Sequence, residues 1–146
     1  EEIAKATSRP AISTASALNA AFTALGARRL AFVSETAEAG HAKKLAYLRE
    51  AGFEIVADRA VGLAGSDAYC TVPPEFWRDT GLALSADSAE AIFLSCANIS
   101  AIDAIEELEA ATGKPVVTSN QAALWSALRT AGIRDQIPRL GALMRR

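Results

Sequence analysis

The sequence contains few of the residues that build metal centres and covalent cross-links. It has two cysteines and one histidine in 146 residues. Two cysteines are too few for the disulfide framework of a secreted protein, and with one histidine they are too few for a Cys/His zinc site. No GxGxxG or GxxxxGKS/T string is present, so a nucleotide cofactor has no direct support. These shortages exclude a scaffold held together by disulfides or by a structural metal.

An excess of either charge is also missing. There are 15 Lys and Arg against 17 Asp and Glu, for a formal net charge of −2. This balance gives no electrostatic footprint for nucleic acid or for an anionic membrane, so we expect neither partner. No apolar run approaches the ~20 residues of a membrane span, and the first residues are acidic and helical rather than signal-like. We therefore expect a cytoplasmic protein, and the length suits one domain with its own core.

What the sequence does contain is an internal repeat. EEIAKATSRPAIST (1–14) aligns with EELEAATGKPVVTS (106–119) at a constant offset of 105. After one extra residue, ALNAAFTALGARR meets ALWSALRTAGIRD. A period this long indicates duplicated α/β lobes rather than a solenoid, with the active site in the crevice between them. The chain then holds one and a half units, and the repeat predicts a strand and a reactive position upstream of Glu1 that match those around Cys96.

Short apolar runs alternate with helical segments along the chain. The runs are bounded by Gly, Pro, Ser or Thr, which is typical of buried strands; they are AIST (11–14), LAFVS (30–34), FEIVADRAV (53–61), AIFLS (91–95) and VVTS (116–119). Segments rich in Ala, Leu, Glu and Arg with a period near 3.6 predict helices at 15–25, 37–51, 74–84, 100–112 and 121–131. This alternation predicts an α/β fold with a parallel sheet and helices on both faces.

Cys96 carries the sharpest chemical hypothesis. It follows AIFLS at the predicted carboxyl end of a strand, where α/β sheets bind ligands, and it precedes a helix predicted to begin at Ser100. Amide N–H groups at a helix start are expected to lower the pKa of the thiol, and they can also hold a carboxylate. The alternative is a buried cysteine that only fills space. Two facing lobes would put such groups on opposite sides of one substrate, which suits adding and removing a proton.

Several motifs resemble a known family. LSCANIS (94–100), GKPVVTSNQA (113–122) and IPRLGAL (137–143) are similar to the second half of Asp/Glu racemase superfamily proteins, in the branch of maleate cis-trans isomerases, arylmalonate decarboxylases and a related ectoine-utilisation protein. The resemblance covers nearly the whole chain but only the later part of a family member. It implies a pseudo-symmetric two-lobed fold, in which residues 1–146 are the second-half lobe with part of the other. Residues 11–119 would be the sheet core, and 120–146 a helix and tail packing on the first lobe.

The same resemblance implies a chemistry. Such proteins work without a cofactor or a metal, with one catalytic position in each lobe. Cys96 is thereby implied to be the acid, base or nucleophile at a carbon beside a carboxylate. Ser95, Ala97 and Asn98 are implied to line the carboxylate pocket. The implied partner is a small carboxylic acid, and we also expect a homo-oligomer.

Two positions depart from the isomerase pattern. Where that branch reads Thr-Pro-Tyr followed by an Asn, this chain has Ser34-Glu35-Thr36 and His41, so Thr36 replaces a substrate-holding tyrosine. The asparagine expected after the third strand falls at Ser66. Both changes remove larger hydrogen-bonding groups from candidate substrate-binding positions. They predict either a different acid or a loss of catalysis.

Four other residues carry groups that could act in a site. Ser119 and Asn120 end the strand next to that of Cys96 and are candidates for substrate binding, although Asn also begins helices as an N-cap. His41 has no carboxylate spaced to orient it, so we expect an exposed position rather than a general base. Cys70 sits in the apolar stretch AYCTV and is expected to be buried.

Two classes of function remain open. The first is an isomerase, racemase or decarboxylase that uses Cys96 on a small acid, and the intact LSC motif favours it. The second is a catalytically silent relative that binds a small acid in a catabolic pathway, which Thr36 and Ser66 favour. We prefer the enzyme. A cysteine about nine residues before Glu1 would indicate chemistry with two bases, and a glycine there a decarboxylase-like mechanism with one cysteine.

Overall fold

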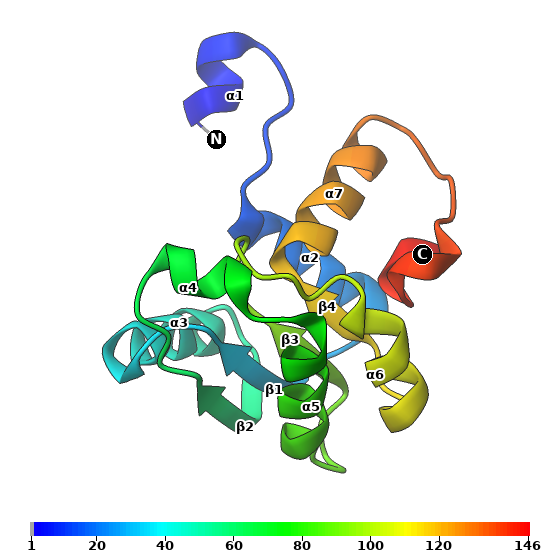
Figure 1. The fold of residues 1–146 in the computed structure, drawn as a ribbon. Coiled ribbons are helices and arrows are strands. Elements are labelled where there is room, and N and C mark those ends of the chain that lie inside the picture. Colours follow the sequence, from blue (N-terminus) through cyan, green and yellow to red (C-terminus); the bar gives the residue numbers. More distant parts are fainter. Residues whose placement is uncertain (1) are drawn as a thin grey trace.

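The structure, a computed structural model that describes residues 2–146, is built on a four-stranded parallel sheet (Figure 1). The strand order is β2-β1-β3-β4, with strands β1 (Arg29–Ser34), β2 (Glu54–Ala60), β3 (Ala91–Leu94) and β4 (Val116–Thr118). The helices are α1 (Glu2–Thr7), α2 (Thr14–Leu25), α3 (Glu38–Glu50), α4 (Ser66–Thr71), α5 (Pro74–Leu84), α6 (Ala104–Thr112) and α7 (Ser119–Thr130), followed by the 3-10 helices η1 (Pro138–Leu140) and η2 (Leu143–Arg145). The α/β fold with a parallel sheet is confirmed.

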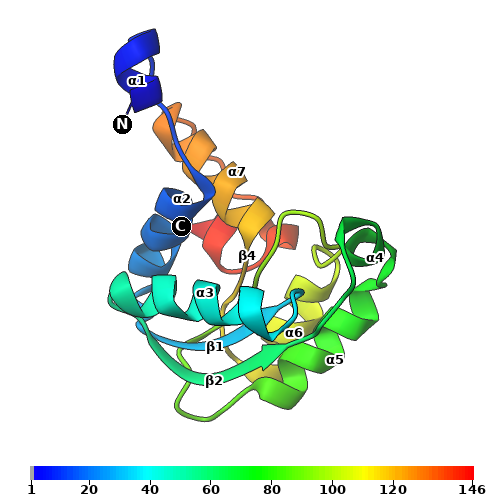
Figure 2. The same cartoon turned by 90° about the vertical axis from the view of Figure 1, so that its left-hand side faces the viewer.

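Helices cover both faces of the sheet because the strand side chains alternate between them. On one face, Leu30 and Phe32 of β1 join the core formed with α2, α3 and α7. On the other, Ala31 and Val33 pack with α5 and α6 around the fully buried Trp77. Figure 2 shows α3 on one side of β1 and β2, with α5 and α6 on the other. The predicted arrangement of helices on two faces is therefore confirmed.

The two copies of the repeat fold alike at α2 and α7. Each helix has 12 residues and begins with a capping box, in which Ser13 pairs with Ser16 and Thr118 with Gln121. The backbone of the two N-cap residues is nearly the same, with φ −116° and ψ 158° at Ser13 and φ −113° and ψ 157° at Thr118. The two helices pack against each other (Figure 1). The repeat seen in the sequence is thus a repeat of local structure.

The strand predicted at 11–14 is wrong. Residues 11–13 form no strand, and α2 already begins at Thr14. Their counterpart in the second copy is β4, which is a strand because Val116 and its two successors pair with β3. In the part of the chain that the structure describes, no strand lies beside 11–13. A strand requires a hydrogen-bonded neighbour as well as a suitable sequence.

The helix predicted from Ser100 begins four residues later, at Ala104. Its N-cap residue, Asp103, makes no side-chain capping hydrogen bond. The segment before it is held by packing instead, since Ile99 and Ala101 are buried in the core below the sheet. A short helix that the sequence did not predict, α4, lies in the 61–73 connection. The loop after β3 is therefore longer than expected, and this changes the surroundings of Cys96.

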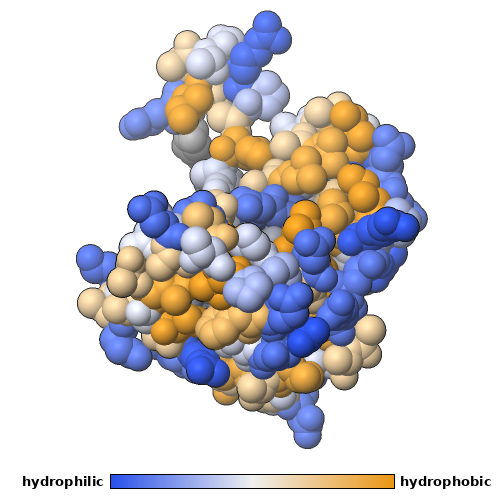
Figure 3. Space-filling model, in the orientation of Figure 1, coloured by the Kyte–Doolittle hydropathy of each residue, from blue (hydrophilic) through white to orange (hydrophobic). Residues whose placement is uncertain are grey.

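The C-terminal tail closes one end of the core. Leu143 and Met144 of η2 are fully buried in the cluster that contains α2 and α7. Figure 3 shows apolar surface in the region of α7, where Leu124 is 44% exposed. Packing of 120–146 on a first lobe stays a prediction. None of the helices in residues 2–146 is long and apolar enough to cross a membrane.

Candidate active site

The candidate site lies where the carboxyl ends of β1 and β3 meet. From β1 the chain crosses to β2 on one side, whereas β3 pairs with the other side of β1. In such sheets ligands bind at the carboxyl ends of the two strands that flank this change of direction. The Ser95 N–H continues the pairing of these strands by donating to the Val33 carbonyl at 2.9 Å. Glu35 thus begins one of the two loops that border the crevice, and Cys96 is the second residue of the other.

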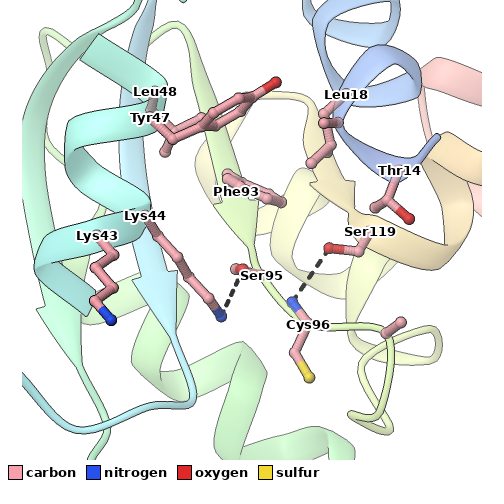
Figure 4. Close-up of a pocket in the computed structure, with 12 residues that line it drawn as sticks. Thr14, Leu18, Lys43, Lys44, Tyr47, Leu48, Phe93, Ser95, Cys96 and Ser119 are labelled. Atoms are coloured by element: carbon pink, nitrogen blue, oxygen red, sulfur yellow. Dashed lines mark hydrogen bonds between the residues drawn. The ribbon is translucent and has the colours of Figure 1, made fainter. Parts of the chain in front are cut away.

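A cavity of about 390 Å³ opens at this crevice (Figure 4). Residues of α2 and α3 line opposite sides, and β3 and the start of α7 lie between them. Its lining residues are Thr14, Ala15, Leu18, Lys43, Lys44, Tyr47, Leu48, Phe93, Ser95, Cys96, Ala97 and Ser119. Four of the residues predicted for the site are brought together here, namely Ser95, Cys96, Ala97 and Ser119.

The backbone of Cys96 is held in an unusual conformation. Its φ is 108°, in the region that L-residues rarely adopt. The Cys96 N–H donates to Ser119 Oγ at 3.2 Å, and the Asn98 N–H donates to the Cys96 sulfur at 3.3 Å. The side chain is partly buried and lies at the cavity. Strained backbone that is fixed on both sides by hydrogen bonds is common where a reactive group must be aimed.

The expected lowering of the pKa of Cys96 is wrong. Burial raises the pKa of the thiol, and the carboxylate of Glu35 raises it further, while the Asn98 N–H and Lys44 act in the opposite direction. Cys96 is not at the start of the helix that follows it, because α6 begins at Ala104, eight residues beyond it. The sulfur receives the Asn98 N–H, but burial outweighs the effect of this bond on the pKa. It is held as a protonated thiol.

A buried ion pair borders the thiol. The Glu35 side chain is 5% exposed, and Lys44 Nζ lies 2.7 Å from both of its carboxylate oxygens. The same ammonium donates to Ser95 Oγ at 3.3 Å (Figure 4). In the sequence, Glu35 stands out only as part of a changed motif, and Lys44 was not predicted as a site residue. A charged residue directly after a buried strand, at the end of the strand that faces ligands, was the available signal.

Two helix N-termini converge on the cavity. Thr14 is the first residue of α2 and Ser119 is the first residue of α7, and both line it. The first N–H groups of a helix have no intrahelical partner, and the helix dipole favours an anion there. Because Ser119 Oγ accepts from Cys96, its own hydrogen is free to be donated to a ligand. These groups are suited to hold a carboxylate.

The exposed position predicted for His41 is wrong. His41 is 2% exposed, stacks on Phe32 with ring centroids 5.1 Å apart, and its Nδ1 lies 2.6 Å from Ser34 Oγ. Its Nε2 lies 2.9 Å from a carboxylate oxygen of Asp58, on the neighbouring strand β2. Thr36 joins the network through a contact of 3.3 Å between its hydroxyl and that of Ser34. This network anchors the end of β1, but none of its members lines the cavity.

Three other predicted residues lie beside the cavity rather than in it. Asn120 donates from Nδ2 to the Ala97 carbonyl at 2.9 Å, and Asn98 donates from Nδ2 to the Ser66 carbonyl at 2.9 Å. All three are exposed and, like Thr36, absent from the cavity lining. They hold the 95–98 loop against α4 and α7. Their predicted roles in substrate binding stay predictions.

The second cysteine is not where it was expected. Cys70 is exposed on the short helix α4, so the prediction of a buried position is wrong. Its neighbours do not form a cage for a metal ion. Within residues 2–146, no group of three or more His, Cys, Asp and Glu side chains is placed to hold one.

Fold and site together define an α/β protein that places a cysteine at the carboxyl end of a central strand, beside a cavity with two helix N-termini. The chain belongs to the arylmalonate decarboxylase family, because residues 1–144 match the sequence model of that family. The family relationship inferred from the LSC and GKPVVTSNQA motifs is thereby confirmed. It places the chain in the branch of maleate isomerases and arylmalonate decarboxylases.

Individual relatives agree with this family. The arylmalonate decarboxylase of Bordetella bronchiseptica is 31% identical over 130 residues, covering 88% of this chain and 54% of the relative. The maleate isomerase of Pseudomonas putida is 29% identical over 136 residues, covering 92% of this chain and 54% of the relative. A structure of Nocardia farcinica maleate cis-trans isomerase, a mutant with a covalently bound succinylcysteine intermediate, is similar with a TM-score of 0.87 at 28% identity, covering 91% of this chain and 55% of that one. The chain thus spans about half the length of the curated relatives it matches.

Proposed function

We propose that the protein containing this chain is a cofactor-independent enzyme that moves a proton at the carbon next to a carboxylate of a small carboxylic acid, with Cys96 as the acid or base. The observation that carries the proposal is the Cys96 thiol beside a cavity on which the N-termini of α2 and α7 converge. Helix N-termini bind carboxylates, and a thiol beside them can exchange a proton with the adjacent carbon. Relatives named for maleate isomerisation and arylmalonate decarboxylation support the same class.

In the proposed reaction the helix N-termini bind the substrate carboxylate, and Cys96 transfers the proton. The substrate carboxylate binds at the N-termini of α2 and α7 and at the Ser119 hydroxyl. When a bond at the α-carbon breaks, its electron pair moves onto the carboxylate and forms an enediolate, which the same N–H groups stabilise. Cys96 then donates its proton to the α-carbon, so that a C–H bond forms and the electron pair of the S–H bond stays on sulfur. Proton abstraction is the reverse of this step.

The surroundings of Cys96 favour the donor direction. Burial and the Glu35 carboxylate raise the pKa of the thiol, so that Cys96 rests in the protonated form that a proton donor needs, whereas the thiolate is the nucleophile. This favours a decarboxylase-type reaction as the second candidate. The bond from the α-carbon to a second carboxylate breaks, CO₂ leaves, and Cys96 protonates the remaining carbanion. A covalent route like that named for the Nocardia isomerase requires a thiolate, which this environment disfavours.

A catalytically silent relative is the competing proposal. It is favoured by Thr36, which replaces the expected tyrosine and lies outside the cavity lining. In that case the cavity would bind a small acid without exchanging its α-proton. The two proposals differ in a single observable, namely whether solvent hydrogen enters the bound acid.

Deuterium incorporation tests the proposal directly. The full-length protein is incubated in heavy water with a panel of small mono- and dicarboxylic acids that includes maleate and an arylmalonate, and mass spectrometry follows deuterium at carbon. The parent is expected to incorporate deuterium into at least one acid or its product. Cys96→Ala should lose about 10²- to 10⁴-fold of that rate, as is typical for loss of a general acid or base.

Cys70→Ala is the matched control, because it removes the other, exposed thiol. It should exchange at the parental rate, and both variants should unfold at the parental urea concentration within experimental error. Exchange at the parental rate in Cys96→Ala would contradict the assigned role. Binding of an acid without exchange in the parent would instead support the silent relative.

A further inference from the structure

A carboxylate is buried close to Cys96. Glu35 directly follows β1 and is 4% exposed, and β1 pairs with β3, the strand that precedes Cys96. A buried carboxylate is costly unless a cation pairs with it, and Lys44 supplies that cation with contacts of 2.7 Å to both oxygens.

The pair is also connected to the loop that holds the thiol. Lys44 Nζ bridges from Glu35 to Ser95 Oγ, the residue next to Cys96. Figure 4 shows the Lys44 ammonium and the Cys96 sulfur pointing to the same side of the end of β3. The Lys44 side chain is 32% exposed, whereas that of Glu35 is 5% exposed, so the lysine forms the outer part of the pair.

We propose that Glu35 and Lys44 are positioning residues for Cys96: Lys44 holds the buried Glu35 carboxylate at the end of β1 and ties it to Ser95, next to the thiol. The carboxylate held there favours the thiol form of the sulfur. The inference rests on the proposed function only in that Cys96 is the reacting group. A thiol beside a fixed carboxylate stays protonated until a carbanion, which is a far stronger base, takes its proton. The thiolate left behind is repelled by Glu35, which favours its reprotonation from solvent.

Within residues 2–146, no Asp or Glu side chain lines the cavity, so none there could act on the thiol as Glu35 does. Besides Lys44, helix α3 contributes Lys43 and Tyr47 to the lining. The lining residues of α2, β3 and α7 carry no titratable side chain apart from Cys96 itself, which follows β3. Glu35, Asn98 and Lys44 are the neighbours that shift the pKa of the thiol, and Glu35 is the anion among them.

Alkylation of Cys96 tests the inference without a substrate. The full-length protein is treated with iodoacetamide between pH 6 and pH 10, and peptide mass spectrometry follows Cys96 and the exposed Cys70 separately. In Glu35→Gln the unpaired Lys44 cation remains, so the profile of Cys96 should move to lower pH. At pH 7 we expect roughly a threefold or larger increase in rate, since the thiolate fraction rises tenfold for each unit by which the pKa falls.

Two further variants keep the test decisive. Glu35→Gln/Lys44→Gln leaves neither charge unpaired, and it should give a profile between those of the parent and Glu35→Gln. Glu38→Gln removes the same charge from an exposed position on α3 and should leave the profile in place. The profile of Cys70 should not move in any variant.

The activity assay separates the two proposals. If the thiol is the proton donor, kcat/KM falls at high pH as the thiol ionises. Glu35→Gln should therefore move this alkaline limb to lower pH by the same amount as the alkylation profile. An unmoved Cys96 profile in folded Glu35→Gln and in the double variant would overturn the inference, while loss of activity in Cys96→Ala would still support the proposed function. An equal movement in Glu38→Gln would also overturn it.

Discussion

Thr14 and Ser119 occupy the same position in the two copies of the repeat, and both face the same cavity. Each is the first residue of a 12-residue helix that begins with a capping box. Ser119 also hydrogen-bonds to the reactive loop, because its Oγ accepts the N–H of Cys96 at 3.2 Å. The duplication therefore supplies two similar helix starts, and the one in the second copy also holds the backbone of Cys96.

This asymmetry predicts different effects of the same substitution. Ser119→Ala removes the acceptor of the Cys96 N–H, and leaving such a group unpaired costs about 1–3 kcal/mol. It should lower kcat at least tenfold in the full-length enzyme. Thr14→Ala should mainly raise KM, because a helix start without its hydroxyl still offers N–H groups. Thr23→Ala, on the exposed side of α2, is the control and should change neither parameter. A decrease in kcat that is equal for Thr14→Ala and Ser119→Ala would contradict the asymmetry.

The His41 network predicts a large effect on stability. His41→Ala would leave the buried Ser34 hydroxyl without its 2.6 Å partner and would open a void beside Phe32. The free energy of unfolding should fall by about 3 kcal/mol, as is usual when a buried hydrogen-bonded network is broken. Urea denaturation followed by circular dichroism measures it. Arg49→Ala, at an exposed position of the same helix, should stay within about 0.5 kcal/mol of the parent. A loss of less than 1 kcal/mol in His41→Ala would show that the network contributes little.

Much of the sheet could be predicted because parallel strands are buried on both faces. The residues of β1, β3 and β4 are almost all buried, so the sequence shows them as continuous apolar runs. Cys96 could be placed at a strand end for the same reason. The strand predicted at 11–14 failed because none of the four strands in residues 2–146 pairs with it, and a sequence pattern carries no information about pairing.

The surroundings of the thiol could not be predicted because they depend on contacts between distant elements. His41 is oriented by Asp58, which is 17 residues away on β2, and Cys96 is next to Glu35 because β1 and β3 are neighbours in the sheet. The strand order decides both contacts. The pKa of Cys96 is raised because its burial, together with the Glu35 carboxylate, outweighs the Asn98 N–H and Lys44, and this burial depends on the fold.

Glu90 predicts a pH-dependent contribution to stability. Its carboxylate accepts the N–H groups of Arg28 at 2.7 Å and Arg29 at 3.0 Å, and these bonds lower its pKa. Because the folded protein binds the ionised form, the stabilisation is present above the pKa of an unfolded glutamate, about 4.3, and is lost as the pH falls through the lower folded value. Glu90→Gln should therefore be less stable than the parent at pH 7, and the difference should shrink below about pH 4.

Urea titrations of Glu90→Gln at pH 7 and at about pH 3.5 provide the measurement. Asp135→Asn, in the exposed segment before η1, is the control for the loss of one negative charge. It should follow the parent at both values of pH. A difference between Glu90→Gln and the parent that is constant with pH would mean that the ionised carboxylate is not what stabilises the start of β1.

The backbone of Cys96 predicts an unusual ranking of two substitutions that both remove the thiol. At a φ of 108° a side chain is strained, whereas glycine adopts this conformation freely. Cys96→Gly should therefore be more stable than Cys96→Ala by about 1 kcal/mol, after subtraction of the greater entropy of glycine in the unfolded chain. Ala97→Gly is the control for that entropy. Because Ala97 does not have a positive φ, glycine should destabilise the protein there. The opposite result in urea denaturation would be that Cys96→Ala is the more stable of the pair. The loop then relaxes when the sulfur is removed, so that the contacts of the thiol, and not the backbone route of the loop, impose the positive φ.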